Sequence, residues 1–246
     1  MNKFIYPNQS EIEITQETID LNKTHWEGYE KKVHESNSIE YVYKKLSEAV
    51  KAKGNARLID IGAQEGLYSL YAKYFDNVRV DAYEPFIESH KCLVDNIALN
   101  DVRDKVFAYN FAISNVKGQT TMRISKTEPS IKTLSYRPFR FKECEELGVF
   151  TEKLDNLYSA RTVDFIRCSA EGWEYFILQG GSNILKRDKP ELLLSVDENA
   201  MAECCIKTEH FFKFLYDLGY KCTGIIDFGN MSFSARELEN TNANLD

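Results

Sequence analysis

Two glycines and one glutamate stand where a nucleoside could be bound. Gly62 and Gly66 follow the short apolar run at 57–61, and Glu84 ends a second apolar run about twenty residues later. Glycine lets a ligand approach the backbone closely, and a carboxylate can accept hydrogen bonds from two ribose hydroxyls. Strand, glycine turn, helix, strand and acid together form the βαβ arrangement that binds nucleosides at the carboxyl ends of parallel strands.

The glycine spacing and a nearby carboxylate favour one class of nucleoside. Gly62 and Gly66 have the spacing G-x-x-x-G, whereas dinucleotide-binding enzymes have G-x-G-x-x-G. Asp60, inside the same strand–turn unit, would repel a pyrophosphate but suits the cationic methionine moiety of S-adenosylmethionine. A methyltransferase is therefore preferred to a dehydrogenase, and an ordinary parallel-sheet turn is the alternative. The residues expected at the cofactor are Asp60, Gly62, Ala63, Gln64, Gly66 and Glu84.

The composition indicates one folded domain with additions. Of the 246 residues, 43% are apolar and 28% are charged, which supports a sizeable core. A net charge of −7 argues against general nucleic-acid binding and against an anionic membrane surface. The N-terminus lacks the apolar core of a signal peptide, and no apolar run is long enough for a membrane helix. The 6 cysteines have no C-x-x-C spacing and indicate reduced thiols in a cytoplasmic protein.

Strand and helix patterns alternate through most of the chain. Residues 1–37 have weak periodicity, and we interpret them as an N-terminal extension that packs on the domain or on a second subunit of a homo-oligomer. The domain is expected at 38–236, followed by a polar tail at 237–246. Its last two strands, 221–226 and 232–235, are expected to pair antiparallel. The sequence thus predicts an α/β doubly wound, mostly parallel sheet with an antiparallel C-terminal edge.

The segment 126–147 has no period and is locally basic in an acidic protein. Long irregular segments of compact domains are commonly functional, so we interpret this one as an ordered substrate loop. Its cations, which include Lys142, suit a phosphate or diphosphate on the acceptor. The alternative is that they are solvated and balance Glu143, Glu145 and Glu146. The candidate substrate residues are Tyr136, Arg137 and Arg140.

Five blocks in order, over about residues 57–220, resemble the FkbM-type S-adenosylmethionine-dependent methyltransferases. LIDIGAQEGLYS is similar to the family's V-D-V-G-A-N-x-G-x-x-S/T, and AYEP to its A-F/Y-E-P. LVDNIALN resembles L-x-x-N-x-x-L-N, and FAISNVKGQTTM resembles the family's strand pair around A-l/v-s-d-x-x-G. VDFIRCSAEGWEYFILQGG followed by KPELLLSV resembles the block I-D-x-I-K-I-D-V-E-G-x-E and its trailing strand.

The resemblance implies a class I methyltransferase (Rossmann-like) fold and methylation of an oxygen, often on a sugar. We expect Asn110 and Ala112, just past the third strand, near the adenine, and Ser169 at the cofactor. Gln64 replaces the family's Asn and keeps an amide in the turn. Ser169 stands where the family has Asp, and because serine is a poor ligand for Mg²⁺ we expect no metal site there.

Methyl transfer to a hydroxyl requires alignment, exclusion of water and a group that removes the proton. Glu171, in the turn after the fourth strand, is the first candidate for this base, and capping of the next helix is its structural alternative. Asp197, after the fifth strand, is the rival base. The four histidines are interpreted as surface or capping residues.

The sequence therefore predicts an enzyme that uses S-adenosylmethionine to methylate a hydroxyl of a sugar or nucleotide-linked sugar, in surface-glycan biosynthesis. The alternative is a non-catalytic nucleoside- or glycan-binding protein with the same fold, which Ser169 motivates. A nucleic-acid methyltransferase is disfavoured by the charge and by Ser-Ala-Glu-Gly at 169–172, where such enzymes have N/D-P-P-Y/F.

Overall fold

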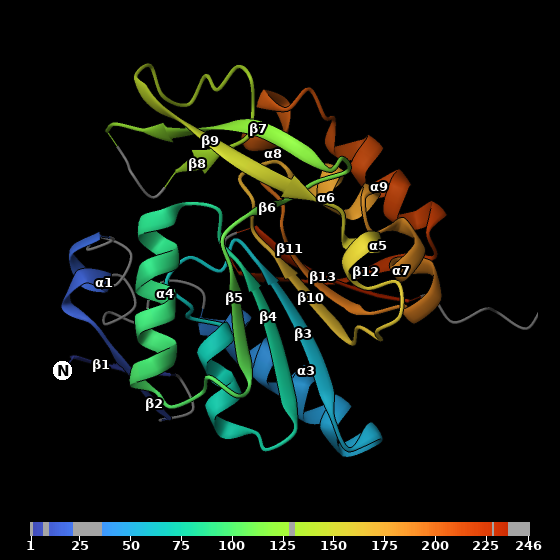
Figure 1. Ribbon diagram of the computed structural model, residues 1–246. Helices are drawn as coiled ribbons and strands as arrows, with labels where there is room; N and C mark the ends of the chain where they lie inside the picture. Colours follow the sequence, from blue (N-terminus) through green and yellow to red (C-terminus); the bar gives the residue numbers. More distant parts are fainter. Residues whose placement is uncertain (1, 7–9, 22–35, 128–130, 228, 236–246) are drawn as a thin grey trace, which may run out of the picture.

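The computed structural model describes residues 2–6, 10–21, 36–127, 131–227 and 229–235 (Figure 1). The polar tail predicted at 237–246 lies outside the described residues, as does part of the predicted N-terminal extension. A seven-stranded sheet lies at the centre of the molecule, and a four-stranded sheet lies over one end of it (Figure 1).

The central sheet is mostly parallel. Its strands lie side by side in the order β12 (Tyr220–Asp227), β13 (Asn230–Ala235), β11 (Glu191–Ser195), β10 (Phe165–Cys168), β3 (Ala56–Ile61), β4 (Val78–Tyr83) and β5 (Val106–Tyr109). β13 runs antiparallel to β11 and to β12, whereas the pairs from β11 to β5 are parallel. The predicted class I methyltransferase fold, a doubly wound sheet with an antiparallel C-terminal edge, is confirmed.

Helices cover both faces of this sheet. Successive side chains of a strand point to opposite faces, so an apolar strand contributes to a cluster on each face. On β3, Leu58 packs into one apolar cluster, while Ile59 and Ile61 pack into the other. The elements on the first face are α3 (Ser36–Lys53), the 3₁₀-helix η1 (Ser69–Tyr74) and α4 (Ile87–Leu99). Those that pack into the second cluster are α5 (Leu154–Leu157), α6 (Glu174–Gln179), α7 (Ser182–Asp188), α8 (Glu198–Glu203) and α9 (Thr208–Asp217).

The four-stranded sheet is inserted between β5 and β10 and lies beyond the carboxyl ends of the parallel strands (Figure 1). Its order is β6 (Ala112–Ile113), β9 (Cys144–Glu152), β7 (Gly118–Ser125) and β8 (Lys132–Thr133). The prediction of an irregular loop over 126–147 is therefore wrong for β8 and for the C-terminal end of the segment, where β9 begins. The start of β9 shows no apolar alternation because neither of its faces is buried there; backbone pairing with β7 and the 2.9 Å Arg123–Glu146 ion pair hold it.

The described part of the N-terminal segment packs on the domain. It comprises β1 (Asn2–Ile5), β2 (Glu11–Ile14) and α1 (Gln16–Leu21), which lie beside α4 in Figure 1. The Tyr6 hydroxyl donates to the Leu67 carbonyl at 2.7 Å, and the Asn100 side-chain oxygen accepts from the Glu13 amide at 2.9 Å. Within the described ranges, no helix has the length and apolar character needed to cross a membrane.

Candidate active site

A cavity of about 70 Å³ lies at the carboxyl edge of the parallel strands, beneath the four-stranded sheet. The ends of β3 and β4 contribute Gly62, Gln64 and Glu84, and the turn after β10 contributes Ser169. Apolar side chains form most of the remaining wall: Tyr83, Phe111, Ala112, Ile113, Met122, Leu134, Trp173 and Ile177. A mostly apolar slot with a few convergent polar groups is the usual form of a cofactor site.

The turn after β3 is built from backbone contacts that leave no room for side chains. The amides of Gly62 and Ala63 donate to the Tyr83 carbonyl at 3.0 and 3.1 Å. Gly62 has φ +72°, and a Cβ there would lie 2.0 Å from the Ser169 carbonyl oxygen. Gln64, with φ +49°, lines the cavity. Of the other predicted contacts, Ala63 and Gly66 shape this turn and are not among the residues described as lining the cavity.

Glu84 is the acid at the end of β4 and has only 3% of its surface exposed. Its carboxylate accepts from the amides of Gln64 (2.9 Å) and Phe86 (2.8 Å), so it is fixed between two turns. Burial raises the pKa of this carboxyl to about 7, against the opposing effects of Lys132 and of the two amides. Each oxygen retains a second lone pair, which leaves capacity for ligand hydroxyls.

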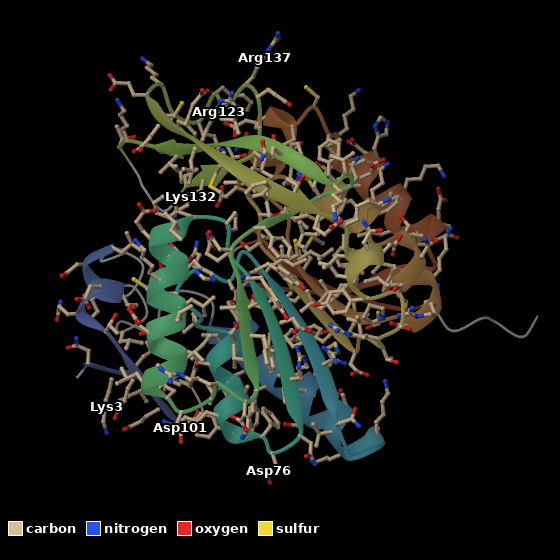
Figure 2. All side chains as sticks on the ribbon, viewed as in Figure 1. Lys3, Asp76, Asp101, Arg123, Lys132 and Arg137 are labelled. Atoms are coloured by element: carbon tan, nitrogen blue, oxygen red, sulfur yellow. The ribbon has the colours of Figure 1, made fainter. Side chains whose placement is uncertain are left out.

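Lys132 is a site residue that the sequence analysis did not select. It lines the cavity from β8, where Figure 2 labels it, and its ammonium lies 4.9 Å from the centre of the Phe86 ring. Its charge lowers the pKa of both Glu84 and Glu171. In the sequence it was one cation of a basic segment; only the pairing of β8 with β7, where Lys132 opposes Ile124, brings it to the cavity.

Asp60 is placed differently from the sequence expectation. It is fully buried and points to the face of the sheet that η1 covers, where Ser69 Oγ donates to it at 2.6 Å. Its register partner on β10 is Arg167, whose guanidinium donates to Asp60 at 3.2 Å and to the Gly62 carbonyl at 2.8 Å. Arg167 neutralises this carboxylate, and Asp60 is not among the described residues that line the cavity. Asp60 therefore supports the turn indirectly, by holding Arg167 against the Gly62 carbonyl.

The two residues expected near the adenine have different positions: Ala112 lines the cavity, whereas Asn110 supports a neighbouring turn. Ala112 is buried and lines the cavity, as does Ser169 in the turn after β10. Asn110 is exposed, and its side-chain amide donates to the carbonyls of Glu84 and Pro85 at 3.0 Å each. Asn110 therefore fixes the turn that carries Glu84.

Glu171 lies next to the cavity and is bound to the predicted substrate loop. Arg140 Nη1 donates to its carboxylate at 2.6 Å, and Arg140 Nε donates to Glu203 at 2.9 Å. Glu203 is buried and also accepts from the amides of Phe139 and Arg140, at 2.8 and 2.7 Å. Arg140 therefore anchors the loop within the protein, where two carboxylates compete with any substrate anion for it.

The contacts of Glu171 and Asp197 bear on the alternative roles predicted for them. The N-cap of α6 is Trp173 and makes no side-chain cap bond, so Glu171 does not cap this helix. Burial raises the pKa of Glu171, which Arg140 opposes, and the second carboxylate oxygen has no hydrogen bond from a described residue. Asp197 is exposed and caps α8, where its carboxylate accepts from the Ala200 amide at 2.8 Å.

Tyr136 and Arg137 line a second cavity of about 450 Å³. This groove lies between β7, the end of β9 and helices α6 and α8, and Trp173 lines both it and the smaller cavity. The Trp173 side chain is thus shared by the walls of the two cavities. No group of three or more potential metal-ligating side chains occurs in the part of the chain that the structure describes.

Comparisons with known proteins identify the family of this chain. The family model described as "Methyltransferase FkbM domain" matches residues 60–222. A search of curated proteins found no match.

Similar solved structures include the FkbM methyltransferase of Methylobacillus flagellatus, at 16% identity and a TM-score of 0.46, covering 74% of this chain and 43% of that one. A putative O-methyltransferase of Klebsiella pneumoniae has 10% identity, a TM-score of 0.46 and coverages of 82% and 81%. M. jannaschii TYW2 in complex with AdoMet has 16% identity, a TM-score of 0.41 and coverages of 81% and 76%. This chain covers less than half of the length of the Methylobacillus protein. TM-scores this low say nothing about the substrate that accepts the methyl group. Because the family model covers well over half of its length, the chain belongs to the FkbM methyltransferase family.

Proposed function

We propose that this protein transfers the methyl group of S-adenosylmethionine to a hydroxyl of a sugar or nucleotide-linked sugar, in the cytoplasm and in surface-glycan biosynthesis. The observation that carries the proposal is the buried Glu84 carboxylate in a mostly apolar cavity at the carboxyl edge of the sheet, beside a wider groove. All six cysteines are free, which suits a reducing compartment.

The residues at the cavity fit the proposed cofactor in chemical character. Glu84 would accept the ribose hydroxyls, Gln64 and Ser169 would offer polar contacts, and Phe111, Ala112 and Met122 would enclose the base. When bound, S-adenosylmethionine supplies an electrophilic methyl group on a sulfonium.

We assign the removal of the hydroxyl proton to Glu171. The second oxygen of its carboxylate is available to accept a proton, and burial raises the pKa of this carboxyl above its ordinary value, against the opposing effect of Arg140. Asp197 is the rival, although its carboxylate already caps α8. Glu171→Gln should lower kcat by roughly 10²–10⁴-fold while leaving cofactor affinity unchanged. Asp197→Asn serves as the comparison, and full activity in Glu171→Gln would remove Glu171 from this role.

Turnover tests the whole proposal. Purified protein is incubated with S-adenosylmethionine and a pool of nucleotide sugars, and S-adenosylhomocysteine is measured with and without the pool. Sugar-dependent formation of S-adenosylhomocysteine supports the proposal, and mass spectrometry then identifies the acceptor that has gained one methyl group.

The second candidate is a non-catalytic protein that binds a nucleoside or glycan on the same fold. It is favoured by Ser169 in place of the family's acid and by Arg140, which already occupies one oxygen of Glu171. Cofactor binding without sugar-dependent turnover would support this candidate over the enzyme.

A further inference from the structure

The groove beside the cofactor cavity continues the same face of the four-stranded sheet. On β7, Met122 lines the smaller cavity and Thr120 lines the groove, two residues apart and therefore on one face of the strand. Trp173 forms the wall between them, and its indole N–H donates to Ser114 Oγ at 3.1 Å, which fixes the ring in place. A molecule in the groove would therefore lie next to any methyl donor in the cavity.

The lining of the groove combines aromatic faces with hydrogen-bonding side chains. Trp173 and Phe176 stand with ring centres 4.4 Å apart, and Tyr136, at 73% exposure, lines the same groove from the loop. Asn115 and Gln119 add amides that can donate and accept. A volume of about 450 Å³ is within the range of small-ligand sites. A ring with apolar faces and hydroxylated edges fits this combination.

The charge of the groove is set by one cation. Arg137 lines it, is exposed, and has no ion pair with a carboxylate of the described chain; Figure 2 shows its side chain projecting outward above the four-stranded sheet. The other charged lining residue, Glu203, is neutralised by Arg140 at 2.9 Å. A guanidinium left without a carboxylate can bind a phosphate or carboxylate through paired hydrogen bonds.

We infer that this groove is the acceptor site and that it takes a hydroxylated ring bearing an anionic group, with the ring against Trp173 and the anionic group at Arg137. This inference rests on the proposed function, since it assigns the second substrate of that reaction. It commits the anion recognition to Arg137 and leaves Arg140 as the anchor of the loop.

Cys205 provides a direct reporter of occupancy. It is exposed and lines the groove, whereas its neighbour Cys204 is buried, with a pKa that burial raises to about 12. Cys222, on β12, is also exposed but does not line the groove, so it is an internal control. The rate of alkylation by iodoacetamide, measured at each cysteine by mass spectrometry, therefore reports whether the groove is occupied. This measurement does not require turnover.

The experiment uses wild-type protein to which S-adenosylhomocysteine has been added. Three probes are then tested one at a time: UDP-glucose, glucose 1-phosphate and methyl α-glucoside. At about ten times the Kd of an anionic probe, alkylation of Cys205 should slow about tenfold while that of Cys222 stays constant. The neutral glucoside at the same concentration should protect weakly. The two anionic probes distinguish a diphosphate-linked nucleotide from a simple sugar phosphate. Absence of protection by all three probes overturns the inference, and so does equal protection by the neutral glucoside.

A matched pair of variants locates the anion. Arg137→Gln should raise the Kd of the protecting anionic probe by about 10- to 100-fold, as expected for loss of hydrogen bonds to a charged group. Lys142→Gln removes an exposed cation of the same segment that is not among the groove residues, and should leave the Kd unchanged. Equal effects of the two variants would show that only the general charge matters and would overturn the assignment of Arg137.

The outcomes separate the inference from the proposed function. Protection of Cys205 without methyl transfer would retain the groove as a binding site and reject the enzyme. Methyl transfer to a nucleotide sugar without protection of Cys205 would retain the enzyme and reject the groove as its acceptor site.

Discussion

The proposed donor side and the proposed acceptor side of this protein are held together by different kinds of contact. The donor side, meaning the turns after β3, β4 and β10, is fixed in large part by hydrogen bonds from backbone amides, to which the side chains of Arg167 and Asn110 add further contacts. The amides of Gly62 and Ala63 bind the Tyr83 carbonyl, and those of Gln64 and Phe86 bind Glu84. Such contacts hold the turns rigidly and leave little room for added atoms, as the Gly62–Ser169 approach shows.

The acceptor side comprises the four-stranded sheet and residues 134–143, and this loop is tied to the domain mainly by side chains. Arg140 bridges Glu171 and Glu203, which lie 31 and 63 residues from it in sequence. The Ser135 hydroxyl donates to the Glu203 carbonyl at 2.6 Å and so ties the loop to α8 a second time. Filling the space next to the backbone should therefore destabilise the donor side. Removing one member of a side-chain ion pair should destabilise the acceptor side, and replacing both members should restore part of the stability.

The largest effect is expected from filling the space at Gly62. Gly62→Ala puts a Cβ 2.0 Å from the Ser169 carbonyl and requires φ +72° of a non-glycine residue. Overpacking and left-handed strain together should cost about 4 kcal/mol or more of unfolding free energy. Gly148→Ala, on β9 and with no atom within 4 Å of the added Cβ, is the matched control and should change stability by about 1 kcal/mol at most. Denaturant unfolding measures both, and similar losses would contradict the comparison.

Removing the anchor of the acceptor side should come next. Arg140→Met leaves the buried Glu203 without its guanidinium and should cost about 3 kcal/mol, because an unpaired buried charge is expensive. The double variant Arg140→Met/Glu203→Gln should recover part of this loss, since position 203 then carries no charge, whereas the Glu171 carboxylate still lacks Arg140. Chemical denaturation of the single and double variants forms a double-mutant cycle. Strictly additive losses would show that Arg140 and Glu203 do not act as a pair.

The two sides also differ in how far the sequence predicts them. Gly62, Glu84 and the alternation of strands are local features, because a turn or a strand end is specified by neighbouring residues. The Arg140–Glu203 pair is not local, and neither the spacing nor the type of these residues reveals which charges meet. β9 was missed for the same reason: its pairing with β7, not an apolar period of its own, makes it a strand. The position of Asp60 beside Arg167 could not be predicted, because strand register is a tertiary property.

Cofactor affinity isolates the donor side. Glu84→Ala removes the acceptor proposed for two ribose hydroxyls, each worth about 1.5–3 kcal/mol when the acceptor is charged, so the Kd for S-adenosylmethionine should rise by about 100-fold or more. Glu88→Ala changes an exposed glutamate of α4 and should leave the Kd unaltered. Isothermal titration gives both values, and melting temperatures confirm that the proteins are folded. An unchanged Kd in folded Glu84→Ala would remove Glu84 from the cofactor site.

The smallest effect is a dependence of cofactor binding on pH that arises at Glu84. Burial raises the pKa of this carboxyl from 4.5 to about 7. Between these values the folded apoprotein holds a proton that the unfolded chain lacks, so Glu84 makes the unfolding free energy fall as pH rises through that window. Hydroxyl binding needs the ionised form, so affinity should change in the opposite sense and weaken as pH falls.

From pH 8 to pH 6 the Kd for S-adenosylmethionine should rise about tenfold, because only about a tenth of Glu84 is ionised one unit below its pKa. The charged side chains that act on it are Lys132, which favours ionisation, and Glu65, which opposes it. Lys132→Met should therefore move the midpoint to higher pH, whereas Glu171→Gln, on the acceptor side, should leave it in place. Titration calorimetry of the three proteins between pH 5.5 and 8.5 measures this, and a Kd that stays constant in the wild type would show that Glu84 does not bind the ribose as a carboxylate.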